Sequence, residues 1–184
     1  DLTSLEKLEP VRVRPGMYIG STGTKGLHHC IWEILDNSID EISNGYGNKA
    51  TIIINKDKSI TIRDNGRGIP TGIHPTKKKS GVEMVFTELH TGGKFNNKNY
   101  KTSGGLHGVG AAVVNALSKW LEVEVHQNGK IYKQRFEYAY DKELKKDMPG
   151  TAVTALEVVG KANDTGTRVT FKPDNEIFST TDFK

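Results

Sequence analysis

The sequence predicts an α/β fold, a two-layer sandwich in which a mixed, mostly antiparallel sheet carries helices on one face. Three observations support this class. The 184 residues suit one domain with a core of its own. The strand-like segments come in neighbouring pairs joined by short polar turns, which is typical of antiparallel hairpins. Helices and strands are segregated along the chain, which argues against alternating βαβ units.

The first expected element is a helix over residues 27–43, after a proline-containing lead at 11–20. Thr24 is expected to cap this helix, and Asn44-Gly45 to end it. Its core-facing residues recur at spacings of three or four, the period of one buried helical face. They are Leu27, Ile31, Ile34, Leu35, Ser38 and Ile42.

The middle of the chain begins with alternating apolar residues at 50–54 and 59–63, which flank the polar turn 55–58 and predict a hairpin. A short helix is expected at 82–89. Residues 91–105 are rich in Gly, Lys and Asn and lack periodicity, which is typical of a lid or a disordered loop.

The second half starts with an apolar helix at 109–117. Next comes a hairpin whose strands, 121–126 and 130–138, flank the strong turn signal Asn128-Gly129. The remaining expected elements are a charged, solvated loop at 141–150 and strands at 153–159 and 167–172. No repeat or linker divides the chain, so we expect residues 1–184 to form a single domain.

Composition excludes several classes of protein. Lys and Arg total 26 against 22 Asp and Glu, and this net charge of +4 is too small to indicate nucleic-acid binding by itself. The single cysteine, Cys30, excludes an internal disulfide and Cys-rich zinc sites, and its apolar helical setting predicts a buried, inert thiol. No apolar run approaches the roughly 20 residues of a membrane span, and the first residues do not resemble a signal peptide. We therefore expect a cytoplasmic protein that does not contact a membrane.

Glycine is the informative residue type. Nine of the 20 glycines cluster at 66–72, 92–93 and 104–110, at joints between well-patterned segments. Any one of them suits an ordinary turn. Together they indicate a cradle for a ligand, because backbone without side chains allows close approach.

A polar stripe follows the apolar face of the first helix. His29, Glu33, Asn37, Asp40 and Glu41 recur at spacings of three and four, so they share one face. Such a stripe is often only solvated. Here it borders the apolar face, where it can line a cleft, and oxygen donors of this kind suit Mg²⁺ and water activation. Glu33 is the candidate base and Asn37 the candidate metal ligand.

The segment DNGRGIP, residues 64–70, begins where a strand ends. Asp64 can accept a hydrogen bond from an exocyclic amine, and Gly66 and Gly68 leave room for a flat ring. On these residues alone an Asp-Asn-Gly turn without a ligand is the better explanation, and the segment gains meaning only beside the glycine run described next.

The run SGGLHGVG, residues 103–110, leads into a helix and predicts a phosphate cradle of converging N–H groups. No Gly-Lys-Ser/Thr follows, which excludes a Walker loop, and no strand precedes it, which excludes a Rossmann fingerprint. Lys94 and Lys101 can close on phosphates or remain solvated. Thr167 belongs to a turn, TGT, whose hydroxyl has a role only if it reaches the base.

The stretches EILDNSIDE, DNGRGIPTGIHP, SGGLHGVG and TGT together resemble the N-terminal ATPase domains of bacterial type IIA topoisomerase B subunits, those of DNA gyrase and topoisomerase IV. The wider group, the GHKL ATPases, includes heat-shock chaperones, mismatch-repair ATPases and histidine kinases. The resemblance covers nearly the whole chain. It implies a Bergerat-type ATP-binding fold.

The resemblance also implies roles for individual residues. Glu33 would polarise the attacking water with support from His29, and Asn37 would hold Mg²⁺ against the phosphates of ATP. Asp64 would accept from the adenine amino group, with Thr167 joining through water. The other implied ATP-binding residues are Gly68, Ile69 and Pro70 in the adenine wall, Glu41 and Arg67 as an ion pair over its mouth, and Lys94, Lys101, Gly105, Leu106, His107, Gly108, Val109 and Gly110 around the triphosphate.

For the whole protein, the resemblance implies that nucleotide-driven dimerisation of two B subunits gates DNA passage in a holoenzyme with an A-type subunit, in the bacterial cytoplasm at the nucleoid. Relatives carry an N-terminal arm and a C-terminal transducer domain; we expect both to be absent here, and the isolated domain to have low or no turnover. Lys101-Thr102-Ser103 and the ending 178–183 favour topoisomerase IV, with gyrase as the alternative. Gln127 stands where many relatives have an arginine that grips ATP-competitive aminocoumarin inhibitors.

Two other functions compete. A histidine kinase needs a phosphoacceptor helix, and the sequence contains no such segment. A nucleotide-binding module without turnover has no use for a base at the position of Glu33.

Overall fold

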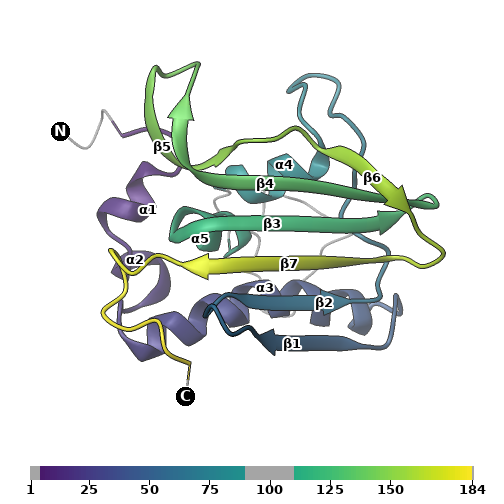
Figure 1. Ribbon diagram of the computed structural model, residues 1–184, viewed down its shortest axis with the longest axis horizontal. Coiled ribbons are helices and arrows are strands. Elements are labelled where there is room, and N and C mark those ends of the chain that lie inside the picture. Colours follow the sequence, from purple (N-terminus) through teal and green to yellow (C-terminus); the bar gives the residue numbers. More distant parts are fainter. Residues whose placement is uncertain (1–4, 90–109, 184) are drawn as a thin grey trace.

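The computed structural model describes residues 5–89 and 110–183, and within them seven strands form one sheet (Figure 1). The strands are β1 (Ala50–Ile54), β2 (Ile60–Asp64), β3 (Ser118–Gln127), β4 (Lys130–Asp141), β5 (Lys146–Ala152), β6 (Glu157–Lys161) and β7 (Gly166–Pro173). Their spatial order is β1-β2-β7-β3-β4-β5, with β6 also paired to β4. Each described pairing is antiparallel.

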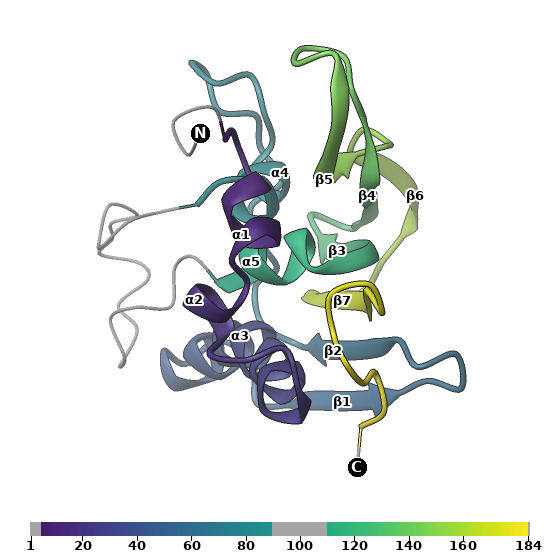
Figure 2. The same ribbon diagram turned by 90° about the vertical axis from the view of Figure 1, so that its left-hand side faces the viewer.

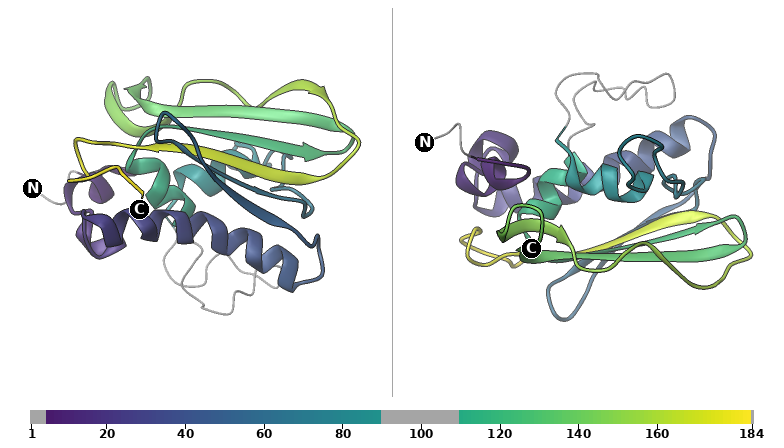
Figure 3. Two further views of the ribbon diagram at one scale, coloured as in Figure 1. Left: turned by 60° about the horizontal axis from the view of Figure 1, so that its bottom comes forward. Right: turned by 90° about the horizontal axis from the view of Figure 1, so that it is seen from above.

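The described helices lie against one face of this sheet, as Figures 2 and 3 show. They are α1 (Glu9–Val13), α2 (Gly16–Ile19), α3 (Thr24–Ser43), α4 (Gly81–Thr87) and α5 (Gly110–Ala116). The predicted two-layer sandwich is therefore confirmed. The sequence does not predict the helices α1 and α2 within the proline-containing lead, because segments of five and four residues are too short to show a helical period.

The start of α3 corrects the expected cap. Thr24 is itself the first helical residue, and its predecessor Gly23 occupies the cap position without a side-chain bond. The hydroxyl of Ser21 accepts instead from the Gly26 N–H at 3.1 Å. The expected end is confirmed, with Asn44 at the C-terminal cap and Gly45 at a φ of 89°.

Both expected hairpins are confirmed. In the first, β1 pairs with β2 from Ala50 opposite Asp64 to Ile54 opposite Ile60. In the second, β3 pairs with β4 around Asn128 and Gly129, whose φ values of 57° and 76° suit the primed turn that Asn-Gly favours.

The prediction of a solvated loop at 141–150 is wrong for most of these residues. Residues 146–152 form β5, which pairs with the end of β4. Asp141 is 7% exposed and accepts the backbone N–H groups of Glu143 and Leu144, so the charged residues make a tight turn between two strands. The alternation that marks a half-buried strand is missing here, because Met148, Pro149 and Gly150 are buried consecutively.

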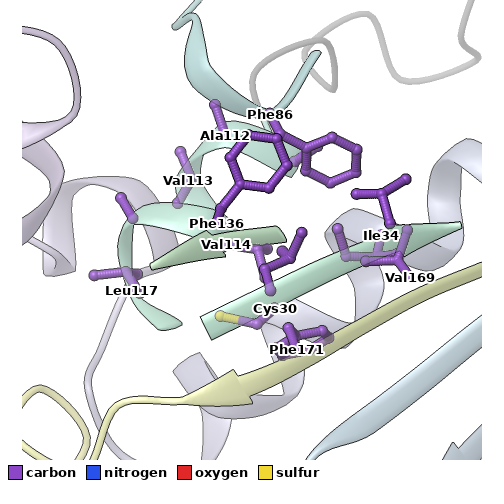
Figure 4. Close-up of a cluster of buried hydrophobic side chains, with 14 of the residues drawn as sticks. Cys30, Ile34, Phe86, Ala112, Val113, Val114, Leu117, Phe136, Val169 and Phe171 are labelled. Carbon is purple, nitrogen blue, oxygen red and sulfur yellow. The ribbon is translucent and has the colours of Figure 1, made fainter. Parts of the chain in front are cut away.

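The core fills the space between sheet and helices (Figure 4). Phe86 of α4 and Phe136 of β4 are buried with ring centroids 5.9 Å apart. Leu27 and Ile34 of α3 are buried as predicted. Cys30 is 1% exposed, and burial raises the pKa of its thiol to about 12, so the prediction of a buried thiol is confirmed.

Candidate active site

Asp64, the last residue of β2, is a buried carboxylate with defined hydrogen bonds. Ser38 of α3 donates its hydroxyl to Asp64 Oδ2 at 2.7 Å, and the Gly66 N–H donates to Oδ1 at 2.9 Å. Asp64 is 8% exposed. Each carboxylate oxygen can accept about two hydrogen bonds, so Asp64 keeps acceptor capacity for an amine of a ligand.

Thr167 lies directly opposite Asp64, because β7 pairs with β2 in a register that aligns the two residues. Its hydroxyl accepts from the Ile69 N–H at 3.1 Å. The preceding Gly166 has a φ of 152°, and a Cβ there would lie 2.1 Å from the Asp64 carbonyl oxygen. The turn TGT thus needs its glycine so that β7 can approach the end of β2.

The loop after Asp64 lies across the end of β3. Gly68 has a φ of 90°, and a Cβ on it would lie 2.9 Å from Val125 Cγ1. Ile69 is partly buried against the core. Glycine at position 68 permits this close approach of the loop to β3.

Glu41 and Arg67 form an ion pair at the edge of the same loop. Arg67 Nη2 lies 2.7 Å from Glu41 Oε1, and the Arg67 N–H donates to Glu41 Oε2 at 2.9 Å. The guanidinium also stacks over the ring of Tyr46, 3.7 Å from its centroid. The loop is therefore tied to the last turn of α3.

Glu33 and His29 lie one turn apart on α3. His29 Nε2 is 3.4 Å from Glu33 Oε1, and the Glu33 side chain is 12% exposed. Glu33 also packs against the first residue of α5, because a Cβ on Gly110 would lie 1.9 Å from Glu33 Oε2. The glycine at 110 thus makes room for a carboxylate.

Asn37 lies one turn beyond Glu33 on the same helix and is partly buried. The described residues contain no group of three or more His, Cys, Asp or Glu that could hold a metal by themselves. The side-chain oxygen of Asn37 fits Mg²⁺ that arrives with phosphates, since such an ion takes one or two protein oxygens and completes its shell with phosphate and water.

Several predicted residues lie outside the described part of the chain. They are Lys94, Lys101, Gly105, Leu106, His107, Gly108 and Val109. The lid expected at 91–105 lies there too. Of the predicted phosphate cradle, only Gly110 is described.

Three residues have contacts at the site that the sequence does not predict. The helical period places Ser38 on the apolar face of α3, although a lone hydroxyl there is a signal for a buried polar partner. The motif assigns Asn65 only to a turn, but its Oδ1 accepts from the N–H groups of Asn48 and Lys49, both at 2.9 Å. Gln127 contacts the loop after Asp64, whereas the resemblance connects its position only with inhibitor binding.

Comparison with known proteins gives a consistent result. Residues 22–177 match the family model described as histidine kinase-, DNA gyrase B-, and HSP90-like ATPase. The chain is 59% identical over 177 residues to the B subunit of DNA topoisomerase 4 from Staphylococcus epidermidis, covering 96% of this chain and 25% of that protein. The corresponding B subunit from Staphylococcus aureus is 59% identical over 174 residues, covering 95% and 25%. The chain thus spans about a quarter of the length of these relatives.

Among solved structures, the 43K ATPase domain of Thermus thermophilus gyrase B in complex with an aminocoumarin is similar, with a TM-score of 0.78 and 44% identity. The match covers 96% of this chain and 42% of that one. In the part of the chain that the structure describes, no helix has the length and apolar character needed to cross a bilayer.

Proposed function

The chain belongs to the family of histidine kinase-, DNA gyrase B- and HSP90-like ATPases, and we propose that it binds and hydrolyses ATP as part of a bacterial type IIA topoisomerase B subunit. The carrying observation is that one helix, α3, carries polar side chains for both ends of the proposed site. It presents Ser38 to the buried Asp64 and, on neighbouring turns, presents Asn37 and Glu33. Recognition of a base and activation of water are thereby joined by one rigid element.

In this proposal the adenine amino group donates to Asp64, whose carboxylate is already oriented by Ser38 and the Gly66 N–H. Thr167, on the neighbouring strand β7, contacts the adenine through a water molecule. Gly68, Ile69 and Pro70 supply a wall against the ring, and the Glu41–Arg67 ion pair borders it.

At the phosphate end, Glu33 orients the attacking water and accepts its proton, which is general-base catalysis. His29, at 3.4 Å, holds the Glu33 carboxylate. Asn37 is the residue that would hold Mg²⁺, which when bound neutralises charge on the phosphates. Lys94, Lys101 and residues 105–109 remain candidates for the triphosphate, together with Gly110.

The whole-protein role is proposed from the relatives. Topoisomerase 4 subunits at 59% identity and a gyrase B structure at 44% identity support a B subunit of topoisomerase IV, with gyrase as the alternative. Its partners would be a second B subunit, an A-type subunit and DNA, in the bacterial cytoplasm. ATP-competitive inhibitors are expected ligands, because the similar gyrase B structure contains an aminocoumarin.

Phosphate release by the complete B subunit, with and without DNA and the A-type subunit, tests this function. We expect release of inorganic phosphate that depends on Mg²⁺ and on Glu33. Transfer of the phosphoryl group to a protein histidine would assign the chain to the kinase branch instead. Tight nucleotide binding without release would make it a binding module.

A further inference from the structure

One side chain at the end of β3 contacts four residues of the loop that follows Asp64. Gln127 Nε2 donates to the carbonyl oxygens of Arg67 and Gly68, both at 3.2 Å, and lies 3.4 Å from that of Ile69. Gln127 Oε1 accepts from the Thr71 hydroxyl at 2.9 Å. The donors and the acceptor of one amide are thus directed at residues 56 to 60 positions away in the chain.

The loop cannot withdraw from this contact without reorganising. A Cβ on Gly68 would lie 2.9 Å from Val125 Cγ1 and 3.3 Å from Gln127 Nε2, so the backbone lies directly on the end of the strand. Close approach of this kind leaves little space for a sideways shift. Contacts with the end of β3 therefore fix the position of the loop relative to the sheet.

A second strand holds the same loop from another direction. The Ile69 N–H donates to Thr167 Oγ1 of β7 at 3.1 Å, while the Ile69 carbonyl faces Gln127 of β3. Thr167 lies opposite Asp64, the proposed acceptor for the base. The distance between the loop and Asp64 thus depends on two side chains, one on each of these strands.

We propose that Gln127 is a positioning residue for the nucleotide, which fixes the loop 67–71 at the spacing from Asp64 that admits a planar base. The proposal rests on the function proposed above and deepens it. Gln127 acts through the loop backbone and not on the reacting phosphate. Its loss raises the dissociation constant for adenine nucleotides while the chemical step keeps its rate.

Variants of similar size test the donor and the acceptor of the Gln127 amide separately and together. Gln127→Met keeps length and removes all polar atoms, and Gln127→Glu keeps the acceptor but turns a carboxylate toward three carbonyl oxygens. Thr71→Val removes only the hydroxyl. We expect the dissociation constant of a non-hydrolysable ATP analogue to rise about tenfold in Gln127→Met, more in Gln127→Glu, and about threefold in Thr71→Val, on the scale of single hydrogen bonds.

The double variant tests whether the two residues act together. In Gln127→Met the Thr71 hydroxyl has already lost its partner. Adding Thr71→Val should therefore change the affinity by less than about twofold, whereas independent effects would multiply. Lys130→Ala is the matched control, because Lys130 is exposed and lies opposite Gln127 in the register of the β3–β4 hairpin.

The readouts are calorimetry of this chain with the analogue, and kcat and KM for ATP in the complete subunit. We expect KM to rise about tenfold in Gln127→Met with kcat within about twofold, and faster hydrogen exchange at the Gly68 and Ile69 amides. Unchanged KM, or a fall in kcat without a rise in KM, would overturn the positioning role.

The inference and the function fail in different ways. If the parent protein binds and hydrolyses ATP but Gln127→Met has normal affinity, only the role of Gln127 is wrong. If the parent protein does not bind adenine nucleotides, the proposed function itself is wrong. A variant that loses affinity only in proportion to a lower melting temperature counts against positioning, and the exchange rates identify that case.

Discussion

The two ends of the candidate site on α3 are built in different ways. The Asp64 end joins residues that are far apart in sequence, because Ser38, Asp64 and Thr167 meet through helix packing and strand pairing. At the Glu33 end, His29 and Glu33 lie one helical turn apart, at positions i and i+4, and Glu33 also packs against Gly110 of α5. The group proposed to recognise the base is therefore placed by tertiary structure, whereas the proposed catalytic group is placed mainly by helical periodicity.

The two carboxylates, Asp64 and Glu33, are expected to respond differently to substitution. Asp64 is buried with two hydrogen bonds, so removing the carboxylate leaves buried donors without a partner. Glu33 also lies in a tight position, against Gly110. We expect changes at the Asp64 end to affect affinity, and changes at the Glu33 end to affect turnover.

The largest expected effect is at Glu33. Glu33→Ala in the complete subunit should lower kcat by about 100-fold or more, the scale of losing a general base, with nucleotide affinity nearly unchanged. Phosphate release and analogue binding measure the two quantities separately. Retained turnover would mean that another residue of α3 is the base, with Asp36 and Asp40 next to be tested. Equal losses of affinity and rate would mean that the Glu33 end and the Asp64 end do not differ in function.

Asp64 should show the opposite pattern. Asp64→Ala removes the acceptor for the adenine amine at a cost of about 1 to 3 kcal/mol, so the dissociation constant should rise roughly tenfold or more. Calorimetry with the ATP analogue checks this. Asp57→Ala, at an exposed turn of the β1–β2 hairpin, is the control that also removes a carboxylate. Unchanged affinity in Asp64→Ala would remove this residue from the site.

Ser38 sharpens the comparison, because it belongs to α3 but acts at the Asp64 end. Ser38→Ala loses one hydrogen bond to a carboxylate, a class of bond worth about 1.5 to 3 kcal/mol to the fold. Only part of that loss should appear in binding, so affinity should fall roughly three- to tenfold while kcat stays within about twofold. The effect should be smaller in an Asp64→Ala background, where the bond no longer exists. An effect of equal size in both backgrounds would mean that Ser38 does not act through Asp64.

The smallest expected effect concerns the turn that leads into Thr167. His126 Nδ1 lies 2.6 Å from Asp164 Oδ1, and its Nε2 lies 2.9 Å from Glu124 Oε2. Partial burial alone would lower the pKa of His126, but the hydrogen bonds to Asp164 and Glu124 outweigh it and raise that pKa above 6.5. The hydrogen bond from His126 holds the pKa of Asp164 below 3.8.

The sign of the pH dependence follows from these directions. Protonated His126 stabilises the fold below its unfolded pKa near 6.5, and the contribution is lost as pH rises through the raised folded value. Ionised Asp164 stabilises the fold above its unfolded pKa of about 3.8, and this contribution is lost as pH falls through the lowered pKa of the folded state. His126→Gln should therefore lower the melting temperature by a few degrees, about 1 to 4 °C, at about pH 5 and by less at about pH 8.5. Equal shifts at the two pH values would exclude the charged pair as the cause.

Much of the fold was predictable because its signals are local. The Asn128-Gly129 turn and the hairpin at 50–64 follow from backbone preferences of a few residues, and both are confirmed. The failures have local causes as well. The short helices α1 and α2 lack a full period, and the buried run Met148–Pro149–Gly150 in β5 lacks alternation.

Residue types and helical spacing were sufficient to select Glu33 and Asn37 as candidates, because a fixed period places side chains on one face. Asp64 and Thr167 gained their expected roles from the resemblance of the linked motifs, since each alone also suits an ordinary turn. Which of them meet was decided only by the sheet. The strand β7 inserts between β2 and β3, and this long-range pairing sets Thr167 beside Asp64 and brings Gln127 onto the loop after it. No local pattern encodes that register, since pairing between distant strands is selected by packing of the whole sheet against its helices.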